Sequence, residues 1–305
     1  MTYPQVLRPG GALLAALALA AALGGCSSDR DAGLGPEAAA LVPAAAAAPV
    51  AADQAAPRAA GRAPAEWLPQ PGAGFFMAAY EDSAPQPGDY DLNDLVVAYQ
   101  YRLGLDADGR IDRIEGQAFI VARGSDAGHD WTLDLRLPPG AAATAECSTV
   151  TPAGQPLPCA ITAGYGRLRW TAFRDTRAAF PAPGADAGAP VNTSGADAFV
   201  RGPKASFTVR FDPAVSLHTV GAGEPWLKLL ASGRELRVND RSDGGLPLAL
   251  MVPEGWAPPL ERMDLALAYP LLPRFAATEG LDARDWWREP LAGRTRAQSS
   301  ADWSW

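Results

Sequence analysis

The chain has 305 residues, of which 34 are Asp or Glu and 26 are Lys or Arg, so its formal net charge is −8. This acidic balance excludes a nucleic-acid binder, because such a protein needs basic side chains against the phosphate backbone, and it also disfavours a polybasic membrane patch. The 31 Gly and 29 Pro residues predict short helices and many turns. The length is sufficient for one large domain or two modest ones.

Residues 1–25 have the pattern of a bacterial lipoprotein signal peptide. One basic residue, Arg8, precedes an uncharged apolar stretch that begins at Gly11 and ends at Leu23. This stretch is too short to cross a bilayer, which takes about 20 apolar residues. The Leu-Gly-Gly-Cys sequence that ends at Cys26 resembles a lipobox, which implies that Cys26 is acylated and becomes the mature N-terminus. The alternative is an ordinary secretory signal with a chance cysteine.

The residues after Cys26 predict where the protein is anchored and how. Ser27 and Ser28 follow the cysteine where an acidic residue would favour retention in the inner membrane, which resembles the sorting signal of outer-membrane lipoproteins. Residues 26–65 are rich in Ala and Pro and contain no aromatic side chain, so they predict a flexible tether. The expected partner at this end is therefore the membrane, through the lipid on Cys26, on either the periplasmic or the surface face.

The body of the chain alternates apolar and polar side chains at period two, which predicts half-buried strands. The clearest strands are Trp131–Leu137 and Ser206–Phe211, and Val96–Leu105 with Ile111–Val121 reads as a hairpin. A short helical segment is expected near Glu261–Leu272. These patterns predict a mainly all-β fold, an antiparallel β-sandwich over residues 66–288, followed by a C-terminal tail at residues 289–305.

The two remaining cysteines, Cys147 and Cys159, are close in sequence. If Cys26 is lipidated, they are an even number in an oxidising compartment, so a disulfide between them is the simplest prediction. Two free buried thiols are the alternative.

An acidic cluster lies between Glu81 and Asp94, where the sequence reads EDSAPQPGDYDLND. Carboxylates this close would repel one another in a folded loop, so a cation is expected to offset their charge. The alternating Asp89, Asp91 and Asn93 match the first three ligands of an oxygen-rich calcium loop, although the later ligands of an EF-hand are missing. The predicted calcium ligands are Glu81, Asp82, Asp89, Asp91, Asn93 and Asp94.

Two other interpretations of the cluster stay open. Asp and Asn side chains also hold solvated turns by hydrogen bonds to backbone N–H groups, without any metal. Alternatively, two of the carboxylates could act as the acid and base of a glycosidase. No serine-hydrolase elbow, phosphate-binding loop or zinc-ligand spacing occurs in the sequence, and the histidines, His129 and His218, stand far from each other.

The stretch EDSAPQPGDYDLNDLVVAYQY resembles the opening motif of the LruC-domain family of bacterial envelope proteins, which reads E-D-x-x-P-x-x-G-D-Y-D-x-N-D-L-V. The resemblance extends from about Gly74 to Trp287, and the chain departs from the family pattern at Arg237, where the family usually has His, and at the tripeptide that begins at Glu224. Looser matches follow in the same order: Val191-Asn192-Thr193, Glu224-Pro225-Trp226, Gly233-Arg234-Glu235-Leu236, Ala268-Tyr269-Pro270, Gly280 and Asp285-Trp286-Trp287.

The resemblance implies a surface or outer-membrane location, no established catalytic activity, and a structural or calcium-binding role for the acidic motif. Together with the residue patterns, it predicts a non-catalytic, lipid-anchored envelope module that presents a binding surface to a protein or glycan. A carbohydrate-active enzyme that uses carboxylates of the acidic cluster is the alternative.

Overall fold

The computed structural model describes residues 66–68, 74–216, 220, 223–238, 240–278 and 280–305. Thirteen strands and a few short helices make up these residues. In chain order they are β1 (Glu66–Leu68), β2 (Phe76–Tyr80), β3 (Leu95–Leu105), β4 (Ile111–Ala122), β5 (His129–Arg136), β6 (Ala143–Val150), β7 (Pro156–Leu157), β8 (Ala160–Gly164), β9 (Arg167–Phe173), α2 (Thr176–Ala179), β10 (Lys204–Val215), β11 (Gly223–Leu229), β12 (Glu235–Arg237), β13 (Ala249–Pro253), α3 (Leu265–Ala268), α4 (Leu272–Ala277), a 3-10 helix (Trp286–Arg288) and α5 (Ser300–Trp303).

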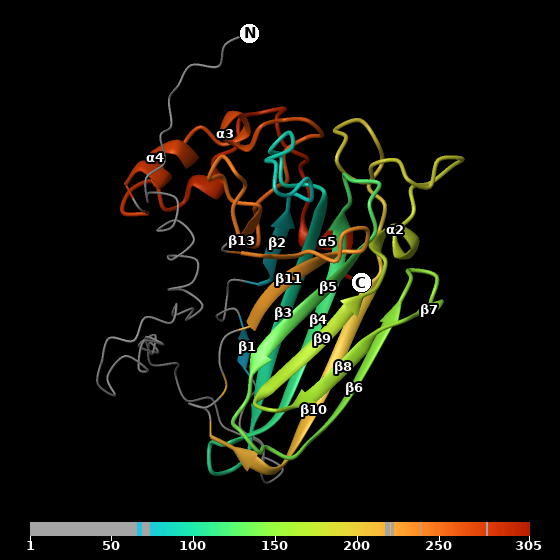
Figure 1. Ribbon diagram of the computed structural model, residues 1–305, viewed down its shortest axis with the longest axis vertical. Helices are drawn as coiled ribbons and strands as arrows, with labels where there is room; N and C mark the ends of the chain where they lie inside the picture. The colour runs from blue at the N-terminus through green and yellow to red at the C-terminus, as the bar shows by residue number, and fades with distance from the viewer. Residues whose placement is uncertain (1–65, 69–73, 217–219, 221–222, 239, 279) are drawn as a thin grey trace, which may run out of the picture.

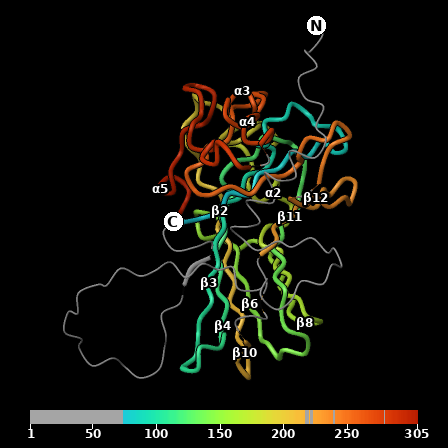
Figure 2. Tube along the Cα trace, turned by 90° about the vertical axis from the view of Figure 1, so that its left-hand side faces the viewer, coloured from blue at the N-terminus to red at the C-terminus, as the bar shows by residue number. Residues whose placement is uncertain are grey.

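The strands form two antiparallel sheets that pack face to face, so the predicted β-sandwich is confirmed. Within the described residues, the larger sheet has eight strands in the order β13-β2-β3-β4-β10-β6-β7, with β1 also paired to β3. The smaller sheet has five strands in the order β12-β11-β5-β9-β8. Figure 2 shows the two layers side by side below the C-terminal part of the chain.

The predicted hairpin is present, because β3 and β4 pair along most of their length. Its turn is held by Asp106, whose side chain accepts hydrogen bonds from the N–H groups of Asp108 at 3.0 Å and Arg110 at 2.8 Å. Gly109 in this turn has a φ of 73°, a conformation that glycine adopts without steric cost.

Alternating side chains from both sheets fill the space between them, which we call the inter-sheet core. On β5, Trp131, Leu133 and Leu135 point into this core, as the sequence predicts. The opposite side of β5 is also covered, because Asp134 lies under Arg169 and its carboxylate pairs with that guanidinium at 2.9 Å. A buried carboxylate needs such a partner, so this strand is buried on both faces and not on one.

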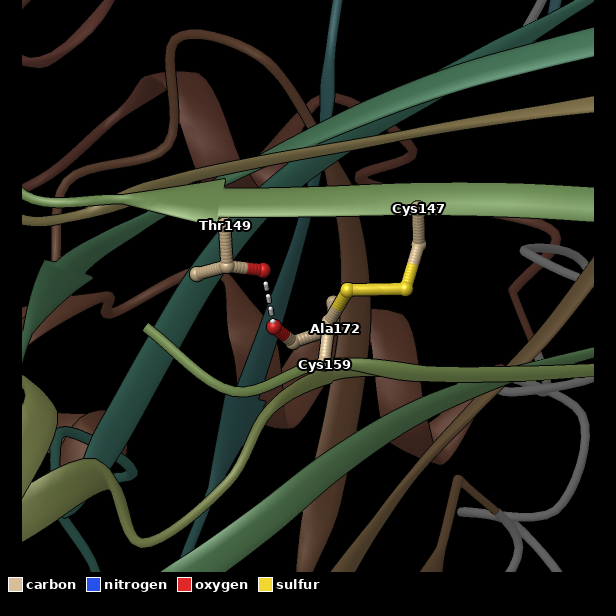
Figure 3. Close-up of a disulfide and its surroundings, with 4 residues drawn as sticks. All are labelled: Cys147, Thr149, Cys159 and Ala172. Atoms are coloured by element: carbon tan, nitrogen blue, oxygen red, sulfur yellow. Dashed lines mark hydrogen bonds between the residues drawn. A yellow bond between two sulfur atoms is a disulfide. The ribbon is translucent and has the colours of Figure 1, made fainter. Parts of the chain in front are cut away.

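A disulfide joins the sheets at one edge of the sandwich, as predicted. Cys147 on β6 of the larger sheet is bonded to Cys159, which directly precedes β8 of the smaller sheet (Figure 3). Next to it, the hydroxyl of Thr149 donates a 2.8 Å hydrogen bond to the carbonyl of Ala172 on β9. The covalent bond and the hydrogen bond therefore both connect one sheet to the other.

The outward face of the larger sheet carries a second hydrophobic core, which we call the outer core. Strands β2, β3, β4 and β13 supply one side of it, and the C-terminal segment, residues 256–296, supplies much of the other. Figure 1 shows α3 and α4 of this segment gathered at one end of the sandwich. Its buried members include Met77, Phe119, Trp256, Tyr269, Phe275, Trp286, Trp287 and Trp303.

Two sequence-based expectations for the C-terminal part need revision. The helical segment expected near Glu261–Leu272 is present as α3, which ends shortly before Pro270, and a separate short helix, α4, begins at Leu272. Residues 289–305, expected as a tail, pack onto the domain: Trp303 of α5 is only 2% exposed and contacts Phe75. Among the described residues, every helix is too short or too polar to cross a bilayer.

Candidate metal centre

The acidic cluster occupies the loop between β2 and β3, drawn in cyan in Figure 1, at the same end of the sandwich as α3. Left-handed backbone recurs at every second position of this loop, with φ values of 60° at Gly88, 60° at Tyr90 and 54° at Leu92. For a residue other than glycine this conformation costs about 1–2 kcal/mol, so the surrounding contacts must compensate for it.

Packing supplies that compensation. Tyr90 and Leu92 are buried in the outer core, and the carbonyl of Tyr90 accepts a 2.9 Å hydrogen bond from the N–H of Leu265. Asp89 and Asp91, which alternate with these residues along the chain, are thereby left to face the other side of the loop. The alternating left-handed backbone therefore directs the side chains of Asp89 and Asp91 toward the same side of the loop.

Three carboxylates meet there. One oxygen each of Glu81, Asp89 and Asp91 lies within 4.8 Å of the others. Two oxygens that bind one calcium ion at about 2.4 Å cannot be farther apart than about 4.8 Å, so the three can share one ion. Gly88 is required beside them, because a Cβ at that position would lie 1.9 Å from Glu81 Oε1.

Burial makes this charge unfavourable without a partner. Glu81 and Asp91 are each only 1% exposed. Burial raises the pKa of Glu81 to about 8 with help from the charges of Asp91 and Asp89, although a side-chain hydrogen bond with Asp94 opposes the shift. Burial and then the charge of Asp89 raise the pKa of Asp91 to about 7. Glu81 therefore mostly carries a proton near neutral pH, and Asp91 is about half protonated there, unless a cation offsets their charge.

Two buried side-chain oxygens of this loop have no hydrogen-bond partner. Glu81 Oε2 and the side-chain oxygen of Asn93, which is 0% exposed, are both buried and unpaired. The amide nitrogen of Asn93 donates to the carbonyl of Pro259 at 3.1 Å, which fixes the orientation of the amide. Its oxygen is then left to accept a further partner, such as a cation. Most buried polar atoms in proteins are paired, and unpaired buried oxygens near carboxylates fit the ligand preference of calcium.

Asp82 and Asp94, also predicted as ligands, have other partners. His129 Nε2 lies 2.8 Å from Asp82 Oδ2, and Asp94 accepts a 2.7 Å hydrogen bond from the backbone N–H of Asp82. Burial opposes ionisation of Asp82, but its hydrogen bonds with His129 and Ser125 lower its pKa. Burial and the charges of Asp82 and Glu81 raise the pKa of Asp94 to about 10. This second group therefore acts to hold the loop against β5.

Two further residues near the candidate site carry no signal in the local sequence. Glu261 lies far along the chain, and its Oε2 is buried without a hydrogen-bond partner. Gly124, which follows β4, leaves the space into which the Asn93 oxygen projects, because a Cβ on Gly124 would lie 2.0 Å from it. The tertiary fold alone brings these residues to the acidic loop.

The other predicted site residues lie elsewhere in the chain. The disulfide is present, as described above. Cys26 and His218 lie outside the described residues.

Comparison with known proteins finds a family model that matches part of the chain and a solved structure with a similar fold. The model of a family described as "Domain of unknown function (DUF4842)" matches residues 237–287, which cover β13 and most of the C-terminal segment. No curated protein matches the chain. Among solved structures, the chain is similar to one described as a "Putative lipoprotein from Bacteroides ovatus", with 12% identity, a TM-score of 0.51, and coverage of 73% of this chain and 75% of that chain. At this identity the likeness concerns the fold.

Proposed function

We propose that this protein is a lipid-anchored lipoprotein of the bacterial outer membrane whose β-sandwich binds calcium and presents a surface to a protein or glycan, without catalysing a reaction. The observation that carries the calcium part is the meeting of buried Glu81 and Asp91 with Asp89, beside unpaired oxygens of Glu81 and Asn93. The resemblance of the acidic motif to the LruC-domain family supports the same function.

Burial also favours a structural cation over glycosidase catalysis. Two catalytic carboxylates must face an open groove that admits a sugar, and in most glycosidases their carboxyl groups are about 5–10 Å apart. Glu81 and Asp91 are instead 1% exposed, with oxygens within 4.8 Å of each other. Such an arrangement suits an ion that stabilises the loop.

The envelope location rests on the N-terminal pattern and on the disulfide. Structural disulfides persist in oxidising compartments such as the bacterial periplasm and cell surface, and the bond between Cys147 and Cys159 fits such a location. The lipobox-like sequence at Cys26 fits it as well. The structural likeness to a protein described as a lipoprotein agrees with both.

Thermal melts test the calcium part. Because calcium would bind only the folded state, it should stabilise the protein by about 2.7 kcal/mol at a hundredfold excess over the dissociation constant, and a chelator should lower Tm. Asp91→Asn, which removes a ligand charge at nearly constant size, should lose most of this response. Asp108→Asn in the exposed hairpin turn is the matched control and should keep it. A wild-type melt that does not move with millimolar calcium leaves the cluster as a solvated turn.

Metabolic labelling with a fatty-acid analogue tests the anchor. We expect label on the wild type and none on Cys26→Ser, because the thiol is the acylation site. A double variant without Cys147 and Cys159 should keep its label, which separates lipidation from other cysteine chemistry. Label on Cys26→Ser would contradict the lipoprotein assignment.

A binding screen tests the presented surface. Arrays of glycans and of extracellular matrix proteins should show calcium-dependent retention of the protein without release of sugar fragments. Release of fragments, lost in Glu81→Gln, would favour the carbohydrate-active enzyme instead.

A further inference from the structure

The smaller sheet turns one face away from the inter-sheet core, and we call it the outward face of this sheet. In Figure 2 this sheet is the layer on the right, so the face is turned to the right. None of the large apolar side chains that are exposed among the described residues lies within its five strands. Protein–protein interfaces usually have an apolar centre, so this face has the character of a site for a polar ligand.

Three arginines gather on this face, along β5 and β9. Arg136 is paired in register with Arg167, and Arg169 with Asp134. The arginines point outward, because the residues that alternate with them, such as Leu168, fill the inter-sheet core. We call Arg136, Arg167 and Arg169 the arginine group. At these four paired positions three positive charges stand against one negative charge, in a chain whose net charge is −8.

Asp134 and Trp226 hold the guanidinium groups in place. Asp134 accepts hydrogen bonds from Nε and Nη2 of Arg169, each at 2.9 Å, and from Nη1 of Arg167 at 3.1 Å. The guanidinium of Arg169 also lies over the indole of Trp226, 5.0 Å from its ring centre, where a cation is attracted to the ring. Side chains that are already ordered lose less conformational entropy when they bind a ligand.

The arginine group keeps hydrogen-bond donors for such a ligand. Arg167 uses only Nη1 and Arg169 keeps Nη1, and the two side chains are 52% and 41% exposed. Arg136 is exposed and makes no ion pair within the described part of the chain. Thr162, which is exposed and paired in register with Arg169, adds a hydroxyl group. The planar fork of a guanidinium matches a carboxylate, as Asp134 already shows.

We propose that the arginine group binds an acidic polysaccharide, whose uronic acid carboxylates pair with the guanidinium groups and whose hydroxyl groups bond to polar side chains such as Thr162. Charge complementarity selects an anionic ligand. The lack of exposed large apolar side chains on these strands selects a sugar chain over a protein. This inference rests on the binding surface proposed above and names its place and its ligand, and it does not depend on the calcium site.

Calorimetric titration of the full-length protein in detergent, at millimolar calcium, tests the ligand class. An oligogalacturonate should bind, and its affinity should fall as salt is added, because salt screens attraction between exposed charges. Dextran of the same chain length, which carries no charge, should not bind. Equal affinity for the two would overturn the acidic ligand.

A pair of double variants tests the place. Arg136→Gln with Arg167→Gln should weaken binding of the oligogalacturonate at least about tenfold, because charge-assisted hydrogen bonds are lost. Arg169 is left unchanged, since it is the main partner of the buried Asp134.

The matched control is Arg110→Gln with Arg210→Gln. It removes the same charge from the exposed hairpin turn and from β10 of the larger sheet, and it should bind like the wild type. Equal weakening by both double variants would show that the net charge of the protein controls binding, which overturns the site. Tm values close to that of the wild type would show that both double variants are folded.

Two further probes separate the sources of negative charge. Poly-L-glutamate with the same number of carboxylates should bind at least about tenfold more weakly than the oligogalacturonate, because it lacks the sugar hydroxyl groups. Equal or tighter binding of poly-L-glutamate would overturn the polysaccharide in favour of an acidic protein. Tighter binding of dextran sulfate would overturn the carboxylate as the recognised group.

The outcomes also separate this inference from the proposed function. If the oligogalacturonate does not bind but a glycan or protein array still retains the protein, the inference is overturned and the binding function stands on another surface. If nothing is retained on any array and the oligogalacturonate does not bind, both fall. If the oligogalacturonate binds while calcium leaves Tm unchanged, the calcium part falls and the inference stands.

Discussion

The larger sheet buries both of its faces, but the two cores are built differently. The inter-sheet core receives alternating side chains from regular strands on both sides, such as Trp131 and Trp170 from β5 and β9. The outer core receives strand residues on one side only, and irregular chain with very short helices on the other. Hydrogen bonds between paired strands therefore hold both sides of the inter-sheet core. One side of the outer core has no such strands and depends on separate contacts made by single residues.

Some of these individual contacts are well defined. The Tyr269 hydroxyl accepts a hydrogen bond from the N–H of Ala257 at 3.1 Å and donates one to its carbonyl at 2.6 Å. Glu254 accepts a 2.8 Å hydrogen bond from the N–H of Phe75. Because regions held by few backbone bonds open locally at lower free energy, we expect the C-terminal segment to open before the sandwich unfolds. The loss of a single contact should therefore matter more to the outer core than to the inter-sheet core.

Replacing one tryptophan in each core should give the largest effect and tests whether the two cores unfold separately. Trp131 is fully buried, packs on Tyr99 and Trp170, and donates to the Tyr80 hydroxyl at 3.2 Å, so Trp131→Ala should cost about 3–5 kcal/mol of global stability. Trp286→Ala, in the outer core, should mainly increase amide hydrogen exchange in residues 256–296 and lower the global urea midpoint less. Equal midpoints for the two variants would show that both cores unfold as one unit.

Removal of the disulfide should have the next largest effect, and that effect should fall on the inter-sheet core. Replacing Cys147 and Cys159 together by Ala should lower the free energy of unfolding by about 3 kcal/mol, because the short loop between them is then unconstrained in the unfolded state. Since this bond joins the two sheets, hydrogen exchange within the C-terminal segment should change little under native conditions. Faster exchange there, without global unfolding, would show that the cores are coupled.

A helix cap should give the smallest effect, confined to the outer core. Asp264 accepts a 2.7 Å hydrogen bond from the N–H of Ala266 at the start of α3. Asp264→Ala should cost about 1 kcal/mol, seen as faster hydrogen exchange in α3, and Asp264→Asn should restore most of it because Asn caps equally well. A global loss as large as that of Trp131→Ala would contradict a locally held segment.

The strands of the inter-sheet core were predictable, because alternation at period two is a local property of the chain. The hairpin of β3 and β4 was recognisable from the turn residues around Gly109, and the pairing of Cys147 with Cys159 from their number and compartment. The polar side of β5 was not predicted as buried, since nothing near Asp134 in sequence announces the two arginines of β9 that cover it.

By itself, the sequence determined the β-sandwich, the disulfide and the acidic loop, because each depends on residues that are close along the chain. Only the tertiary structure decided which of the acidic residues meet: it groups Glu81 with Asp89 and Asp91, gives Asp82 to His129, and brings Glu261 to the same end. It also turned the expected C-terminal tail into part of the outer core, with Trp303 buried. Contacts between residues far apart in sequence follow from how the layers pack, and they leave no periodic pattern in the chain.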